Sequence, residues 1–100
     1  MLVNSNEVYT FKLVSGEELI AKVLQKDNNL IFIQEPVSIA PGPQGIGLIP
    51  SLFTVSDKTE PVTLNTACIS MYAKTDDAVK LKYLEATTGI TVPEKKIVFG

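Results

Sequence analysis

The sequence has 100 residues, enough for one domain, and 45% of them are hydrophobic. The net charge is −2 at pH 7, with no histidine and one cysteine. These values argue against a broad basic surface for nucleic acid or membrane, a histidine-based catalytic or zinc site, and an internal disulfide. The high apolar content is typical of a subunit that self-associates, although an ordinary well-filled core explains it nearly as well.

The beginning of the chain is predicted to form two strands joined by a short turn. Apolar and polar residues alternate over residues 8–14 and again within residues 18–26. Ser15-Gly16 between them predicts a two-residue turn, in which glycine supplies the positive φ that a hairpin requires. Each strand places three apolar residues on one face: Tyr9, Phe11 and Leu13 in the first, and Leu19, Ala21 and Val23 in the second.

A second turn and a third strand follow. Asp27-Asn28-Asn29 is rich in side chains that tolerate left-handed backbone, so it predicts a turn. Leu30-Ile31-Phe32-Ile33 begins a strand that is apolar on both faces, and both faces are therefore expected to be covered. The cover is either the rest of a closed barrel or a neighbouring subunit. Glu35-Pro36 then marks a break or a strand edge, because Pro36 has no N–H to donate.

The middle of the chain alternates between loops and short extended segments. Pro41–Gly45 is the clearest loop in the sequence. Residues 46–55 form a fourth extended segment, interrupted by Pro50, and residues 56–61 form a polar loop. The last sheet segments are expected at residues 62–64 and 67–73.

Residues 75–88 are ambiguous between helix and strand. Val79–Tyr83 alternates like a strand, but Thr75 or Asp76 can cap a helix and Gly89 follows its end. Because the start and stop signals agree with each other, we expect a helix. The tail, residues 89–100, contains Pro93 and a short apolar run at residues 97–99. It is expected to be either disordered or an edge strand.

Catalytic and metal-binding chemistry is sparse. Cys68 lies in an apolar stretch, which predicts a buried structural thiol. The carboxylates of Glu17-Glu18 and of Asp76-Asp77 are sequence neighbours, so we interpret them as solvated turn and helix-start residues and not as an acid/base pair. The glycines near residue 45 lack the ending of a phosphate-binding loop. We therefore expect no enzyme, no cofactor and no metal site.

The cellular setting is expected to be the cytoplasm. The N-terminus lacks a basic stretch followed by an apolar one, and no run approaches the roughly 18 apolar residues of a membrane helix. A single cysteine fits a reducing compartment.

Residues 11–32 resemble the first motif of the Sm-like (LSm/Hfq-type) family. The motif positions fall on Leu13, Gly16, Ala21, Val23, Asp27 and Leu30. Residues 64–69 fit the second motif loosely, with Asn65-Thr66 in place of Arg-Gly, and Ile31 stands where the family has an RNA-contacting asparagine. The loop between the motifs is long, and the helix candidate is C-terminal where most members begin with one. The arrangement looks most like the divergent members of phages, including cyanophages, which would place the protein in the host cytoplasm.

The resemblance implies one mostly β domain with a core at about residues 7–74. Its fold would be a strongly bent five-stranded antiparallel barrel of the SH3 type. In the family, the fourth strand of one subunit pairs with the fifth strand of the next, closing a homo-oligomeric ring of about five to seven copies. The seam residues expected here are Ile49, Leu52, Phe53, Ile69 and Met71. The alternative is a monomeric SH3-like barrel.

The resemblance also implies a ring that binds single-stranded RNA or acts as an RNA chaperone. The positions matching the family's RNA site are Asp27, Asn28, Asn29, Asn65 and Thr66. Asparagine side chains can read base edges. Neither a DNA duplex nor a membrane is an expected partner. The alternative is a ring that has lost RNA binding and serves as a protein-interaction or virion-associated assembly module.

Overall fold

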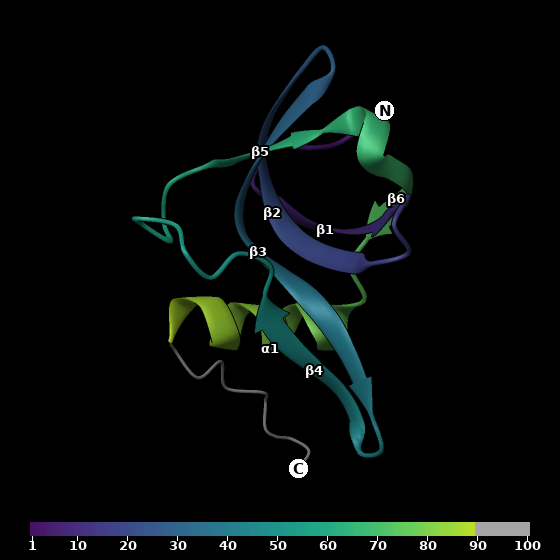
Figure 1. The fold of residues 1–100 in the computed structure, drawn as a ribbon, viewed down its shortest axis with the longest axis vertical. Coiled ribbons are helices and arrows are strands. Elements are labelled where there is room, and N and C mark those ends of the chain that lie inside the picture. Colours follow the sequence, from purple (N-terminus) through teal and green to yellow (C-terminus); the bar gives the residue numbers. More distant parts are fainter. Residues whose placement is uncertain (90–100) are drawn as a thin grey trace.

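The computed structural model describes residues 1–89, and the tail after Gly89 lies outside the described residues, as do the two alternatives expected for it. Within these residues, six strands form one antiparallel sheet and one helix follows them (Figure 1). The elements are β1 (Glu7–Leu13), β2 (Glu18–Asp27), β3 (Leu30–Gly42), β4 (Gly45–Pro50), β5 (Val62–Asn65), the 3-10 turn η1 (Thr66–Cys68), β6 (Ile69–Lys74) and α1 (Asp77–Thr88). The prediction of a mostly β, antiparallel fold with a C-terminal helix is confirmed.

The strands are ordered β4-β3-β2-β1-β6, and β5 pairs with β3 beside this path. β3 changes partner along its length: Leu30–Ile33 pairs with β5, and Val37–Gly42 pairs with β4. β4 and β6 therefore end the path and are not paired with each other within residues 1–89. The prediction of a closed five-stranded barrel is wrong on this point, because β4 follows the far half of β3 away from the body, as Figure 1 shows, and does not reach β6.

A bulge lies where β3 changes partner. Ile20 of β2 opposes Val37, and Lys22 opposes Gln34, so two residues of β3, at positions 35 and 36, face one residue of β2. Glu35 has a φ of 52°, in the left-handed region. The break predicted at Glu35-Pro36 is therefore a bulge inside a continuous strand.

The turns follow the residue types that favour them. Asn28 adopts a φ of 51° in the β2–β3 turn, and Gly16 adopts a φ of 95° in the β1–β2 turn. The loop predicted at Pro41–Gly45 is shorter than expected, since Gly42 and Gly45 pair with each other and only residues 43 and 44 connect β3 to β4. Sequence composition marked the reversal but not the strand pairing that continues almost to its tip.

The main core lies on one face of the curved sheet. Phe11, Val23 and Ile31 are among its fully buried side chains, and both apolar faces predicted for the first two strands contribute to it. Partly buried residues of β5 and β6 cover the rest: Val62, Leu64, Ile69 and Tyr72. The side chains of β5 and β6 thus pack on the same core.

Helix α1 covers the opposite face of the sheet. Tyr83 is buried against Val8, Ile20 and Val37, so the alternating side chains of β1 and β2 are buried on both faces. The helix ends are as expected: the carboxylate of Asp76 accepts hydrogen bonds from the N–H groups of Ala78 and Val79 at 3.1 and 3.2 Å. Gly89 ends the helix in a left-handed conformation.

Candidate functional site

The two turns matched to an RNA site lie together at one end of the molecule. Asn65 pairs with Leu30, and the N–H and hydroxyl groups of Thr66 donate to the carbonyl oxygen of Asn29 at 2.9 and 3.1 Å. Residues 37 positions apart in the sequence therefore share one surface, which we call the turn face. It consists of Asp27, Asn28, Asn29, Asn65 and Thr66, of which all but the half-buried Thr66 are exposed.

Local hydrogen bonds fix part of this turn face. The side-chain oxygen of Asn65 accepts from the N–H of Ala67 at 2.9 Å and so caps η1. The ammonium group of Lys26 donates to the carbonyl oxygen of Asn28 at 3.0 Å. The side chains of Asn28 and Asn29 point from an exposed turn, so the turn face offers amide groups and one nearby cation beside the carboxylate of Asp27.

The position where the Sm-like family, which residues 11–32 resemble, has a further RNA-contacting asparagine is not part of the turn face. Ile31 is fully buried in the main core, beside Phe11 and Val23. A side chain at this position packs inside the domain and does not reach a surface ligand. The chain also contains no arginine, the residue that the second motif of the family would supply at position 65.

The residues predicted for a subunit seam lie on or near the two ends of the sheet. β4 and β6 are the terminal strands of the pairing path. Phe53 and Met71 are 77% and 65% exposed, and Ile49 and Leu52 are also exposed. Ile69 differs, because its side chain is half-buried against the main core. Ile46 and Val55, which were not predicted, extend the exposed apolar set next to β4.

Cys68 is exposed, so the prediction of a buried thiol is wrong. The residue lies in η1, and this 3-10 turn interrupts the alternation of buried and exposed residues that a continuous strand would impose. Within residues 1–89, no group of three or more His, Cys, Asp or Glu side chains is arranged to hold a metal ion.

A small polar cluster joins three segments near the bulge. The hydroxyl of Ser38, which is buried in β3, donates to the carboxylate of Glu17 and shares a 2.9 Å hydrogen bond with the hydroxyl of Ser51. Glu17 was interpreted as a solvated turn residue, and it is exposed, but it also satisfies this buried hydroxyl. The cluster links β3 to the residue before β2 and to the residue after β4.

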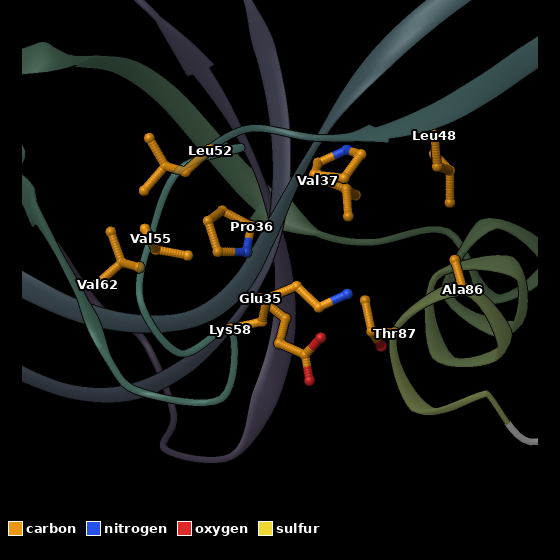
Figure 2. Close-up of a pocket in the computed structure, with 11 residues that line it drawn as sticks. Glu35, Pro36, Val37, Leu48, Leu52, Val55, Lys58, Val62, Ala86 and Thr87 are labelled. Carbon is orange, nitrogen blue, oxygen red and sulfur yellow. The ribbon is translucent and has the colours of Figure 1, made fainter.

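One apolar pocket was not anticipated from the sequence. It lies between the bulge of β3, the connection from β4 to β5 and the last turn of α1 (Figure 2). Its volume is about 120 Å³. The lining residues are Glu35, Pro36, Val37, Leu48, Pro50, Leu52, Val55, Lys58, Val62, Ala86 and Thr87. They come from three distant parts of the sequence, at residues 35–37, 48–62 and 86–87, and no local motif signals their meeting.

The sequence matches no protein-family model, and no curated protein matches it. In the described part of the chain, α1 is too short and too polar to cross a membrane.

Proposed function

We propose that the protein is a ring-forming subunit of the Sm-like type, without enzymatic activity, whose turn face binds single-stranded RNA. About five to seven copies would associate through β4 of one subunit and β6 of the next. The observation that carries the proposal is the pair of open sheet edges, each with exposed apolar side chains. Unpaired edges of this kind invite pairing with another chain, and association would satisfy both of them.

The open sheet itself supports association between copies. β6 lies beside β1 and leaves its other edge free of strand partners in residues 1–89, and β4 does the same beside β3. Met71 on β6 and Ile49 on β4 would lose their exposure to water when two such edges meet. A monomer would have to keep both edges and both side chains exposed.

The turn face supports RNA as the ligand. Single-stranded RNA is recognised through unstacked bases, whose edges form hydrogen bonds with polar side chains. Asn28, Asn29 and Asn65 provide exposed amide groups on one surface, and a ring would repeat that surface around its axis. Repetition compensates for the net charge of −2 on each subunit, because several weak contacts along one strand act together.

The oligomeric state is tested by light scattering coupled to size exclusion. The native chain is expected to elute as a ring, and Met71→Asp is expected to dissociate it while the subunit stays folded. Val14→Asp is the matched control, since Val14 is 69% exposed but lies in the β1–β2 turn outside the edge strands. A native chain that is monomeric at every concentration would refute the ring.

RNA binding is tested by fluorescence polarisation with short U-rich and A-rich RNAs at physiological salt. We expect saturable binding that Asn29→Ala weakens by roughly fivefold or more, corresponding to about 1 kcal/mol. Asn65→Ser removes the amide but keeps an oxygen that can cap η1. Gln44→Ala is the control, since this exposed amide lies in the β3–β4 turn at the other end of the molecule (Figure 1).

A second function is favoured by the burial of Ile31 and by the cap that already engages Asn65. In that case the ring has lost RNA binding and serves as a protein-interaction or virion-associated assembly module. A well-formed ring that binds neither RNA would support this second function and exclude the first.

A further inference from the structure

Phe53 is an aromatic side chain that the described part of its own chain leaves largely uncovered. It lies in the connection between β4 and β5, shortly after β4 ends at Pro50, and it is 77% exposed. Large aromatic side chains are frequent anchors of protein interfaces, where they fill a hollow on the partner surface. A surface with a matching hollow would therefore explain why the connection presents a phenyl ring to water.

A hollow of sufficient size lies on β6, the strand at the other end of the pairing path. Its volume is about 480 Å³, which exceeds the roughly 150 Å³ of an apolar cavity that holds one benzene ring. Met71 can adapt to a ring placed there, because a thioether is flexible and contacts aromatic rings favourably. We call this site the β6 hollow, and its lining residues are Met1, Thr66, Ile69, Ser70, Met71 and Tyr72.

From this arrangement we infer that Phe53 of one copy packs into the β6 hollow of the next copy. The inference rests on the ring proposed above and adds a side-chain contact to each of its junctions. Figure 1 shows the connection between β4 and β5 on the opposite side of the body from β6, so Phe53 cannot reach the β6 hollow of its own chain. A ring and a hollow on opposite sides of one chain produce head-to-tail contacts, which is the geometry of a closed cyclic assembly.

The direction of the strands agrees with this contact. Every strand pair within residues 1–89 is antiparallel. If β4 and β6 of two copies also pair antiparallel, the end of β4 lies beside the start of β6. The β6 hollow is at that start, because Thr66 precedes the strand and Ile69 opens it. Antiparallel pairing thus carries Phe53 to the hollow, whereas a parallel pair would carry it toward Lys74.

The polar side chains around the β6 hollow already have partners in their own chain. The hydroxyls of Ser70 and Thr66 donate to backbone carbonyl oxygens at 3.0 and 3.1 Å, and the hydroxyl of Tyr72 accepts from a backbone N–H at 2.6 Å. An apolar ring can cover these groups without leaving one of them unpaired. Covering the exposed surface of Met71 together with that of Phe53 is favourable in proportion to the apolar area.

A tryptophan at position 53 tests the contact in the full chain. The sequence contains no tryptophan, so Phe53→Trp introduces a single indole reporter. We expect blue-shifted emission and protection from acrylamide quenching in the assembled ring, and the loss of both when dilution or an added Ile49→Asp dissociates it. Lys82→Trp is the matched control, since Lys82 is exposed on α1 and its indole should respond to neither treatment.

Disulfide trapping tests which residues meet. In a Cys68→Ser background, Phe53→Cys combined with Ser70→Cys should link copies to each other under mild oxidation, because a disulfide forms only between closely spaced residues. The linked chains are counted on a non-reducing gel. Ile46→Cys combined with Ser70→Cys is the control, because antiparallel pairing places the start of β4 beside the end of β6. Its yield of linked chains should be several-fold lower.

The failure of this contact and the failure of the ring give different results. An assembled ring whose indole at position 53 is as exposed as that of the diluted chain would overturn the inference and leave the ring in place. A higher yield of linked chains from the Ile46 pair than from the Phe53 pair would do the same, as would Phe53→Ser assembling at the same concentration as the native chain. A native chain that stays monomeric would remove the ring and the inference together.

Discussion

The hydroxyl of Tyr83 in α1 donates a hydrogen bond to the backbone carbonyl oxygen of Gln34 in β3 across 2.9 Å. The same hydroxyl accepts a hydrogen bond from the N–H of Lys22 in β2 at 3.1 Å. Lys22 and Gln34 oppose each other directly beside the β2–β3 bulge. A helix side chain thus satisfies the backbone groups at the point where the register shift weakens the hydrogen-bond ladder.

Removing this hydroxyl should destabilise the fold. Tyr83→Phe keeps the ring but leaves a part-buried N–H and a part-buried C=O without their partner, which costs about 1–3 kcal/mol. Urea unfolding followed by circular dichroism measures the loss. Tyr72→Phe is the control, because among residues 1–89 the hydroxyl of Tyr72 accepts one hydrogen bond, from the exposed N–H of Leu2, and its loss should cost less than about 0.5 kcal/mol. Equal stability of Tyr83→Phe and the native chain would contradict this role.

The same phenol should make stability fall at high pH. Burial raises the pKa of Tyr83 from its usual value of 10.0 to about 12. The folded chain therefore holds this proton more tightly than the unfolded chain, so the contribution is complete below pH 10 and is lost as the pH rises toward 12. The difference in unfolding free energy between the native chain and Tyr83→Phe should shrink over that interval. A constant difference from pH 8 to pH 12 would argue against a buried neutral phenol.

Replacing each of two glycines by alanine should change the stability of the fold in opposite directions. Gly16 has a φ of 95° with open space around it, so Gly16→Ala is opposed by backbone strain alone and should destabilise by about 1 kcal/mol. Gly47 lies in β4, and an added methyl group there would meet the carbonyl oxygen of Ala40 at an ordinary 3.6 Å. Gly47→Ala should be neutral or stabilise by up to about 1 kcal/mol. Thermal unfolding of both variants measures these changes in stability. If Gly16→Ala were more stable than Gly47→Ala, the turn would not need glycine.

Local sequence patterns were sufficient to predict most of the strands, the turns and the helix. Alternation located β1 and β2 and the faces they bury, asparagines marked the β2–β3 turn, and Asp76 with Gly89 marked the ends of α1. Each of these signals depends on residues close together in the sequence. They are therefore readable without knowing which strand lies beside which.

The predictions that were wrong concern contacts between residues that are distant in the sequence. Closure of the sheet was wrongly predicted because the bulge at Glu35 lets β3 change partner, and no local pattern reveals that choice. Cys68 was predicted to be buried because its apolar neighbours resemble a strand, whereas the Asn65 cap starts a 3-10 turn there. The turn face was assembled through the family resemblance, and the structure adds the hydrogen bonds between Asn29 and Thr66.

The division of β3 between two partners also separates the domain into regions of unequal local stability. The half next to β5 lies over the main core, whereas the end that pairs with β4 near Pro41 and Ile46 forms a two-stranded ribbon with exposed side chains. Such a ribbon is marginal by itself in water. Its amide protons should exchange with solvent through local fraying, long before the core opens. Contact of another chain with that ribbon would therefore first suppress this local fraying.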